Sequence, residues 1–320
     1  MNELHKACEI GDLKRVTSLL SSKNINTQNR EGKTPLYVAS KYAHLDTVKV
    51  LVGKKECDLN IPDLQGNTPL HTACKHIFPS VVQFLVGNQR CRLNTQNREG
   101  KTPLHIASKH SRMTTVEVLV SVQECNLNIP DQKGNTPLHI ACKHSHHSTV
   151  ELLVADQRCQ SINTQNKEGE TPLLLALKYG TLSTVKVLVS RQECKFNIPD
   201  GKGNTPLHIA CRHGYYSTVE LELLVADQRC LSINTQNTEG QTPLHTASEH
   251  GHLDIVRVFV SRKDCDLNIP DERGNTPLHT ACKHGHHSTV QFLVADQGCE
   301  LHAKNCEMNT PLHIACTQKH

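Results

Sequence analysis

The chain has 320 residues, of which 3% are aromatic and 37% hydrophobic, and it contains no Trp. So few large side chains argue against one wide globular core and favour thin layers of helices. The net charge is +4 with His neutral, so overall charge gives little support to nucleic-acid binding.

The 15 Cys residues bear on the redox compartment of the protein. In a small secreted protein they would indicate disulfides. This chain is long, and its first residues, MNELHKACEIGDLKRV, have no apolar signal-peptide core. No stretch approaches the roughly 18 apolar residues that a membrane span requires. We therefore expect an intracellular, cytoplasmic protein with reduced thiols and no membrane span.

The tripeptide Thr-Pro-Leu recurs along the chain at intervals of 34 to 37 residues. It starts at Thr34, Thr68, Thr102, Thr136, Thr171, Thr205, Thr242, Thr276 and Thr310. A fixed period of this length predicts stacked supersecondary units, not independent domains. The variants NTQNREGKTPLHIASKH (94–110) and NIPDQKGNTPLHIACKH (128–144) alternate, so the copied unit is a pair of repeats.

Each unit predicts a turn, a short helix, a loop and a second helix. In the unit around Thr136, the preceding PDQKGN carries the Pro, Asp and Gly of a tight turn. Thr136 can cap a helix N-terminus, and a proline follows at the first helical position. We expect the first helix over 137–144 and the second over 148–155. Neither has enough apolar surface to be stable alone, so stacking must supply it.

These units resemble ankyrin repeats. The matching motifs are DxxGxTPLHxAC, the LLV of the second helix, and the CDLN of residues 57–60, where the family usually has Gly-Ala-Asp-Val-Asn. The resemblance implies an all-α, ankyrin-repeat α-solenoid of paired antiparallel helices joined by β-turn-like loops.

We expect one continuous solenoid over residues 1–320. Its parts are an N-terminal capping partial repeat at 1–24, eight repeats at 25–301 and a truncated final repeat at 302–320. Because the chain stops after a first helix, we expect residue 320 to end a fragment, and the last layer to expose its apolar side.

Three departures from the family pattern carry structural expectations. Each unit has one extra residue just before its Cys, so that loop is expected to bulge. The segment VELELLVA (219–226) reads like VELLVA with two residues inserted, which would turn a helix by roughly 200° and requires a bulge or a longer loop. Met308 stands where Gly66 and Gly134 stand in other units, and it strains the turn if that position has φ > 0.

The Cys residues are predicted to pack as small hydrophobic side chains. One set replaces the alanine before the family's Asp-Val-Asn and comprises Cys57, Cys91, Cys125, Cys159, Cys194, Cys230, Cys265 and Cys299. The other replaces an alanine on the inner helix and comprises Cys8, Cys74, Cys142, Cys211, Cys282 and Cys316. A ladder of disulfides between layers is not expected, because helix packing sets equivalent positions about 8–10 Å apart.

A His follows most Thr-Pro-Leu tripeptides, and the family resemblance implies that it ties the turn together through hydrogen bonds between units. Tyr37 and Leu174 replace it in two units, which a metal site would not tolerate. The chain contains no GxxxxGK phosphate loop, no HExxH and no GxSxG. We therefore predict no metal site, no cofactor and no catalytic residue.

Partners of ankyrin-like arrays usually meet the turn tips and the exposed side of the first helix. On that helix, the two residues that follow the inner Ala-Cys or Ala-Ser pair form what we call the basic row. The predicted partner-binding residues are Lys41, Tyr42, Lys75, His76, Lys109, His110, Lys143, His144, Lys178, Tyr179, Arg212, His213, His250, Lys283 and His284. With Glu249 included, the first members of the pairs sum to +6, so positive charge is concentrated on one predicted face.

Two interpretations of the basic row stay open. It is either a solvated face copied with its repeat, or a groove for an acidic or phosphorylated segment of another protein, strengthened below about pH 6.5 by its His residues. The leading functional prediction is a non-enzymatic protein–protein interaction scaffold or adaptor. The alternatives are a nucleic-acid-binding repeat protein, disfavoured by the lack of a basic run and of stacking aromatics, and the recognition part of a larger signalling protein with an effector domain beyond residue 320. The sequence does not indicate the oligomeric state.

Overall fold

The computed structural model describes residues 2–76, 78–110, 113–179, 181–214, 233–296 and 298–318. It divides the chain into two compact units, which we call unit 1 (Met1–Ser161) and unit 2 (Ile162–His320). In the described part of both units the regular secondary structure is helical and contains no strand, which confirms the all-α prediction. The inserted segment 219–226 and Cys230 lie outside the described residues.

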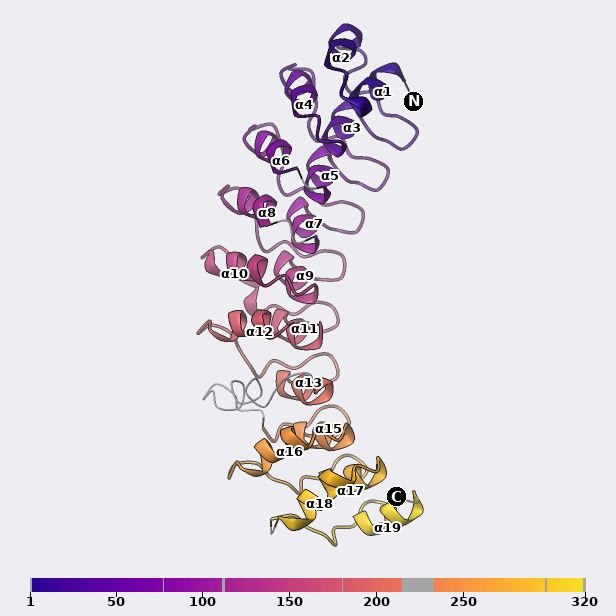
Figure 1. Ribbon diagram of the computed structural model, residues 1–320, viewed down its shortest axis with the longest axis vertical. Coiled ribbons are helices and arrows are strands. Elements are labelled where there is room, and N and C mark those ends of the chain that lie inside the picture. Colours follow the sequence, from indigo (N-terminus) through magenta and orange to yellow (C-terminus); the bar gives the residue numbers. More distant parts are fainter. Residues whose placement is uncertain are drawn as a thin grey trace. The chain divides into compact units, whose positions relative to one another are not determined.

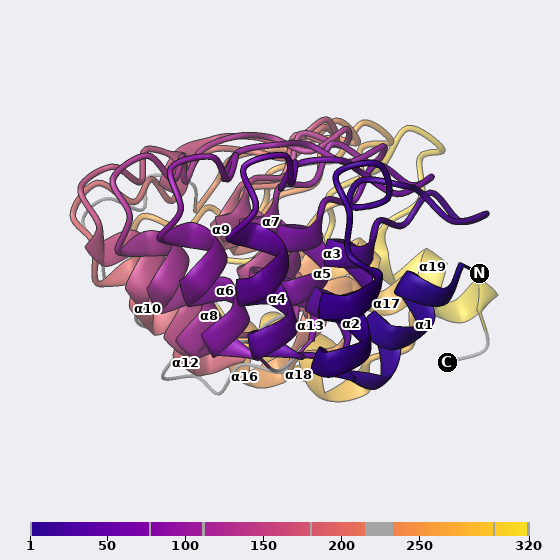
Figure 2. The same ribbon diagram turned by 90° about the horizontal axis from the view of Figure 1, so that it is seen from above.

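Unit 1 is a stack of helix pairs. Its helices are α1 (Glu3–Ile10), α2 (Leu13–Leu19), α3 (Pro35–Lys41), α4 (Leu45–Val52), α5 (Pro69–Lys75), α6 (Pro79–Val86), α7 (Pro103–Lys109), α8 (Met113–Val120), α9 (Pro137–Lys143) and α10 (His147–Ala155). The odd-numbered helices form one row and the even-numbered helices a second (Figure 1), and each helix packs on its counterpart in the next repeat. The connecting loops of unit 1 gather on one side of both rows (Figure 2).

Unit 2 repeats this pairing. Its described helices are α11 (Pro172–Tyr179), α12 (Leu182–Val189), α13 (Pro206–His213), α15 (Pro243–Glu249), α16 (Leu253–Val260), α17 (Pro277–Lys283), α18 (His287–Ala295) and α19 (Pro311–Thr317). A 3-10 turn, η1 (Ser161–Asn163), lies at the boundary of the two units. Leu312 of α19 is 70% exposed, whereas Leu70, at the same position of α5, is 1% exposed. None of the described helices is long and apolar enough to cross a membrane.

The helix boundaries follow from local sequence. The N-cap of α5 is Thr68, whose side chain accepts from the backbone N–H of His71, and a proline occupies the first turn. The predicted first helix of the 136 unit ends at Lys143, one residue early, because His144 forms the C-cap. The predicted second helix begins one residue early, because His147 is its first residue and not part of the loop.

In the described residues of the Cys57 set, the extra residue before the Cys lies in a hydrogen-bonded turn. The backbone N–H of Cys57 donates to the carbonyl of Lys54 at 3.1 Å, and the N–H of Cys125 donates to Val122 at 3.1 Å. The segment that was expected to bulge therefore closes as a compact turn at the end of the second helix.

Two arginines form hydrogen bonds that join one repeat to the end of the preceding even-numbered helix, which we call the outer helix. The Arg90 guanidinium donates to the carbonyl of Val52, the last residue of α4, and to the carbonyl of Cys57. Arg158 makes the equivalent bonds to the carbonyl of Val120, at the end of α8, and to that of Cys125. Each guanidinium thus satisfies carbonyls that a helix C-terminus leaves unpaired and places positive charge at the negative end of the helix dipole.

The turn glycines are required by both conformation and space. Gly66 has φ +83°, and a Cβ there would lie 2.7 Å from the backbone nitrogen of Arg98 in the next repeat. Met308 takes the same left-handed conformation at φ 63°, which confirms the predicted strain at this position.

Candidate partner-binding groove

The basic row lies at the ends of the inner helices. Lys41, Lys75, Lys109 and Lys143 are the last residues of α3, α5, α7 and α9. Lys75, Lys109 and Lys143 are exposed and Lys41 is half-buried. Because these helices stack in register, their final residues fall in one line along unit 1.

A hollow of about 580 Å³ runs beside this line. Its lining includes Thr72 of α5 and Ile106 of α7. The residues at or just after helix ends that line it are Lys41, Lys75, His76, Lys109 and His110. The turn residues that line it, which we call the turn wall, are Asp63, Leu64, Gln65, Asn67, Asn97, Arg98, Glu99 and Lys101.

A second hollow, of about 470 Å³, adjoins the first. The two share Glu99, Lys101 and Lys109, and the second adds Lys143 and His144 from α9. We call the two hollows together the unit 1 groove. Seven of the eight predicted binding residues of unit 1 line this groove, and Tyr42 does not.

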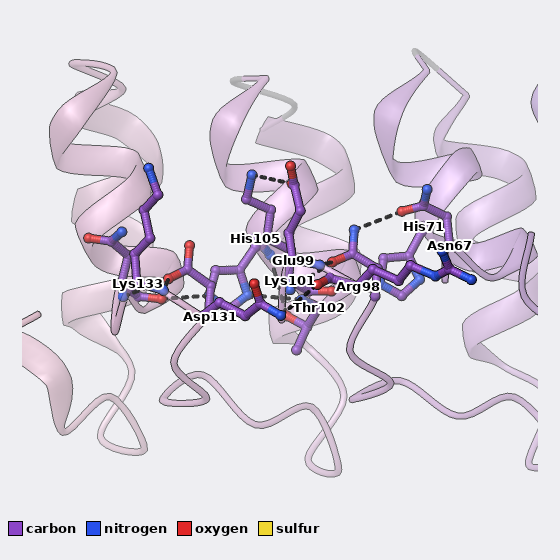
Figure 3. Close-up of polar contacts among 12 residues, drawn as sticks. Asn67, His71, Arg98, Glu99, Lys101, Thr102, His105, Asp131 and Lys133 are labelled. Carbon is purple, nitrogen blue, oxygen red and sulfur yellow. Dashed lines mark hydrogen bonds and ion pairs between the residues drawn. The ribbon is translucent and has the colours of Figure 1, made fainter. Parts of the chain in front are cut away.

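Hydrogen bonds between repeats hold the turn wall of the groove (Figure 3). The backbone N–H of Arg98 donates to the carbonyl of Gln65 at 2.9 Å. The Asn97 side chain donates to Asn67 Oδ1 at 2.8 Å and accepts from the N–H groups of Glu99 and Lys101 at 3.0 and 2.9 Å. The turn wall is therefore ordered before any ligand binds, which lowers the entropic cost of binding.

The His of five Thr-Pro-Leu-His motifs joins two repeats, as the family resemblance implied: His71, His105, His208, His245 and His279. His71 Nδ1 accepts from the backbone N–H of Thr68 at 3.1 Å, so its Nε2 carries the proton and donates to the carbonyl of Lys101 at 2.9 Å. This geometry requires a neutral ring. Burial lowers the pKa of His71 to about 4 and lowers that of His105. In the unit where Tyr37 replaces the His, the Tyr37 hydroxyl instead donates to Asp63 of the next repeat at 2.8 Å.

The positive charge of the groove is partly neutralised from within. Six Lys or Arg side chains and two carboxylates line the first hollow. Lys33 is paired with Glu31, and Lys101 with Glu99 at 2.6 Å. Lys75 and Lys109 have no ion-pair partner among the residues that the structure describes. The groove therefore keeps cations that a ligand can neutralise.

Some rings of the basic row have a structural role that sequence reasoning missed. His144 stacks on His146 with ring centroids 6.0 Å apart, and His146 Nε2 donates to the carbonyl of Lys109 at 3.0 Å. Tyr42 stacks in the same way on His44 at 6.5 Å. The sequence did contain a signal for this stacking, because a second His follows each of these rings two positions later, as His44 and His146.

The expected strengthening below pH 6.5 needs a correction for three of these His residues. Burial, followed by nearby positive charge, lowers the pKa of His144 and of His213 below 6.5. Burial also lowers the pKa of His284. These rings gain charge only at a lower pH than the sequence alone indicates.

The corresponding surface of unit 2 differs in charge. Lys178 is paired with Glu170 at 2.8 Å, which raises the pKa of Lys178. A hollow of about 280 Å³ contains Lys283 and His284 together with Glu249, and four carboxylates line it against two cations. Tyr179, Arg212, His213 and His250 line none of the hollows described above; His250 stacks on His252 at 5.9 Å.

The Cys and His residues that the structure describes do not gather into a metal site. Among the described residues, no three His, Cys, Asp or Glu side chains are placed to hold one ion. Cys74 and Cys142 are fully buried, as the packing prediction requires. Burial raises the pKa of the Cys57 thiol to about 11 and that of Cys91 to about 12, so these thiols remain protonated at neutral pH. Cys316, in contrast, is exposed.

Stacked helix pairs with ordered turn tips and an open polar groove define a helical repeat protein with a long recognition surface. The family model for ankyrin repeats (3 copies) matches residues 4–97, 77–163, 158–230, 221–305 and 264–320. The chain belongs to the ankyrin repeat family, which confirms the predicted family and its all-α solenoid fold class. Ankyrin repeats generally mediate protein–protein interaction, and proteins built from them are typically non-enzymatic scaffolds. No curated protein matches the chain.

Proposed function

We propose that the chain is a non-enzymatic interaction scaffold or adaptor that binds an acidic segment of another protein on its inner helix ends and turn tips. The observation that carries this proposal is the charge of the first hollow of the unit 1 groove, which six cations and two carboxylates line. Lys75 and Lys109 line it without an ion-pair partner among the described residues. An acidic ligand would gain from Coulomb attraction and from a wall that is already ordered.

Charge also affects the rate of binding. A line of cations in one groove attracts an acidic partner before contact and speeds association. The Debye length falls from about 10 Å at 0.1 M salt to about 3 Å at 1 M. The proposal therefore includes an affinity that weakens with added salt, chiefly through slower association.

The test is charge reversal within the groove. The variant Lys75→Glu, Lys109→Glu, Lys143→Glu should lower the affinity for a synthetic poly-Asp peptide at least tenfold at low salt. A matched control reverses the same charge on unit 1 lysines that lie outside both hollows: Lys14→Glu, Lys54→Glu, Lys55→Glu. The control should weaken binding by less than about threefold, because its charges are farther from the ligand.

An equal loss of affinity for the peptide in both triple variants would mean that only the net charge of the protein matters, and would contradict binding in the unit 1 groove. Unchanged affinity in the groove variant would remove the basis for an acidic partner. A chain that binds duplex DNA more tightly than the peptide, with a steep salt dependence, would favour the nucleic-acid alternative.

A further inference from the structure

The lysines of the first hollow that have no carboxylate partner recur once per repeat, while Arg98 of the same hollow belongs to a turn. Lys41, Lys75 and Lys109 each end an inner helix, and each lines the first hollow. Lys41 contacts the hydroxyl of Tyr42 at 3.1 Å but no carboxylate among the described residues. The other two lysines of this hollow, Lys33 and Lys101, are held by Glu31 and Glu99.

The stacking of the helices fixes the interval between these cations. α3 packs on α5, and α5 packs on α7. Packed helices lie about 8–10 Å apart, so residues at the same position of consecutive repeats are separated by about that distance. An extended or polyproline II chain advances about 3.1–3.4 Å per residue, so three of its residues span one repeat.

The spacing of the lysines favours an extended ligand over a helical one. Two layer spacings cover about 18 Å. An extended segment spans that length with about six residues, whereas an α-helix needs about twelve, so the extended segment reaches all three lysines with fewer residues to order. The lining residues Ile106 and the half-exposed Leu64 offer apolar contact to the ligand side chains that lie between the charged ones.

We infer that unit 1 binds an extended segment whose carboxylates occur at every third residue, each facing one of Lys41, Lys75 and Lys109. This inference rests on the function proposed above. The adjoining hollow extends the same interval to Lys143, so a segment of about ten residues carries four matched carboxylates. Unit 2 does not continue the pattern, because Lys178 is paired with Glu170 and Glu249 occupies the position of a cation.

Peptides of identical composition test the interval separately from the charge. Three labelled dodecapeptides with blocked ends each carry four Asp among uncharged residues: at positions 1, 4, 7 and 10; in one block at positions 5–8; and in a second block at positions 1–4. Fluorescence anisotropy with the full chain at low salt should give about tenfold tighter binding for the spaced peptide than for either block peptide. A longer, helix-forming peptide with four Asp seven residues apart should bind no better than the block peptides.

Protein variants provide the second arm. Lys109→Gln should weaken the spaced peptide at least threefold, while Lys109→Arg keeps its affinity and Lys54→Gln, outside the hollows, leaves it unchanged. If all the extended peptides bind equally and Lys109→Gln weakens them equally, the interval is wrong and the acidic-partner proposal stands. If none binds, the acidic-partner proposal itself fails. Tighter binding of the helix-forming peptide would overturn the extended conformation of the ligand.

Discussion

Unit 1 ends α3, α5, α7 and α9 with lysines, whereas unit 2 ends α15 with Glu249 and pairs Lys178 with Glu170. Both units have the same Thr-Pro-Leu caps and the same inter-repeat turn bonds. In unit 1 the backbone N–H of Gln132 donates to the backbone carbonyl of Glu99 at 3.0 Å, and in unit 2 the backbone N–H of Glu272 donates to that of Glu239 at 3.1 Å. The scaffold is thus shared while the groove charge differs, because exposed positions can change without disturbing the bonds that stack the repeats.

Acid should affect both units alike, and this is the largest expected effect. Burial lowers the pKa of His71 in unit 1 and of His208 in unit 2 to about 4, below the unfolded value of 6.5. Because the folded pKa is depressed, their stabilising contribution is present above pH 6.5 and is lost as the pH falls toward 4. At pH 5 each ring should cost about 2 kcal/mol of unfolding free energy relative to pH 7.5. Urea unfolding at the two pH values measures this loss, and equal stability at both would contradict neutral, bridging His residues.

The bonds from an arginine to the end of the preceding outer helix should change the stability of the two units in opposite directions when the arginine is removed from one and added to the other. Arg158 donates to carbonyls at the end of α8, and Gly298 occupies the same position beside α16 in the sequence ADQGC. Arg158→Ala should destabilise unit 1 by about 2 kcal/mol, because the bonds involve a charged donor. Gly298→Arg should stabilise unit 2 by about 1 kcal/mol, since a Cβ there meets no backbone atom within 4 Å and its closest contact is a side-chain oxygen of Asp296 at 3.1 Å.

Thermal unfolding of the two single variants and of the double variant measures both effects. An Arg158→Ala protein as stable as the parent would show that the guanidinium only replaces water at these carbonyls.

Turn strain provides the next comparison. Met308→Gly should stabilise unit 2 by about 1 kcal/mol, because φ 63° is costly for a residue with a Cβ. Gly66→Ala should destabilise unit 1 by at least that amount, since the new Cβ would lie 2.7 Å from a backbone nitrogen. Opposite signs in unfolding midpoints are expected. A destabilising Met308→Gly would mean that contacts of the Met side chain outweigh its backbone strain.

The smallest effect concerns groove charge in unit 2. In a chain whose unit 1 groove carries the three Lys→Glu changes, Glu249→Lys should raise affinity for the poly-Asp peptide by about threefold, or about 0.6 kcal/mol. Asp254→Lys, at an exposed residue of α16 outside the hollow, is the matched control. Equal gains from the two changes would show that the position of the charge in unit 2 does not matter.

Local pattern predicted most of the fold. The caps, the inner Cys and the strained Met308 followed from residue types at fixed offsets within one repeat. The groove was harder to predict because its properties depend on residues in different repeats or far apart in one. Glu170, which neutralises Lys178, lies eight residues away, and the His146 ring reaches a carbonyl 37 residues earlier. Counting the charges of the basic row from the sequence therefore overestimates the positive charge that is available to a ligand.

The bonds that join the repeats of unit 1 also bear on how it would respond to force. His105 reaches a carbonyl 30 residues ahead, Gln28 one 34 residues ahead, and Arg90 one 38 residues back. Each such bond ties a repeat to its immediate neighbour. Tension applied to the two ends of unit 1 would pass through these interfaces in series. The unit should therefore lengthen in steps, each the unfolding of one repeat.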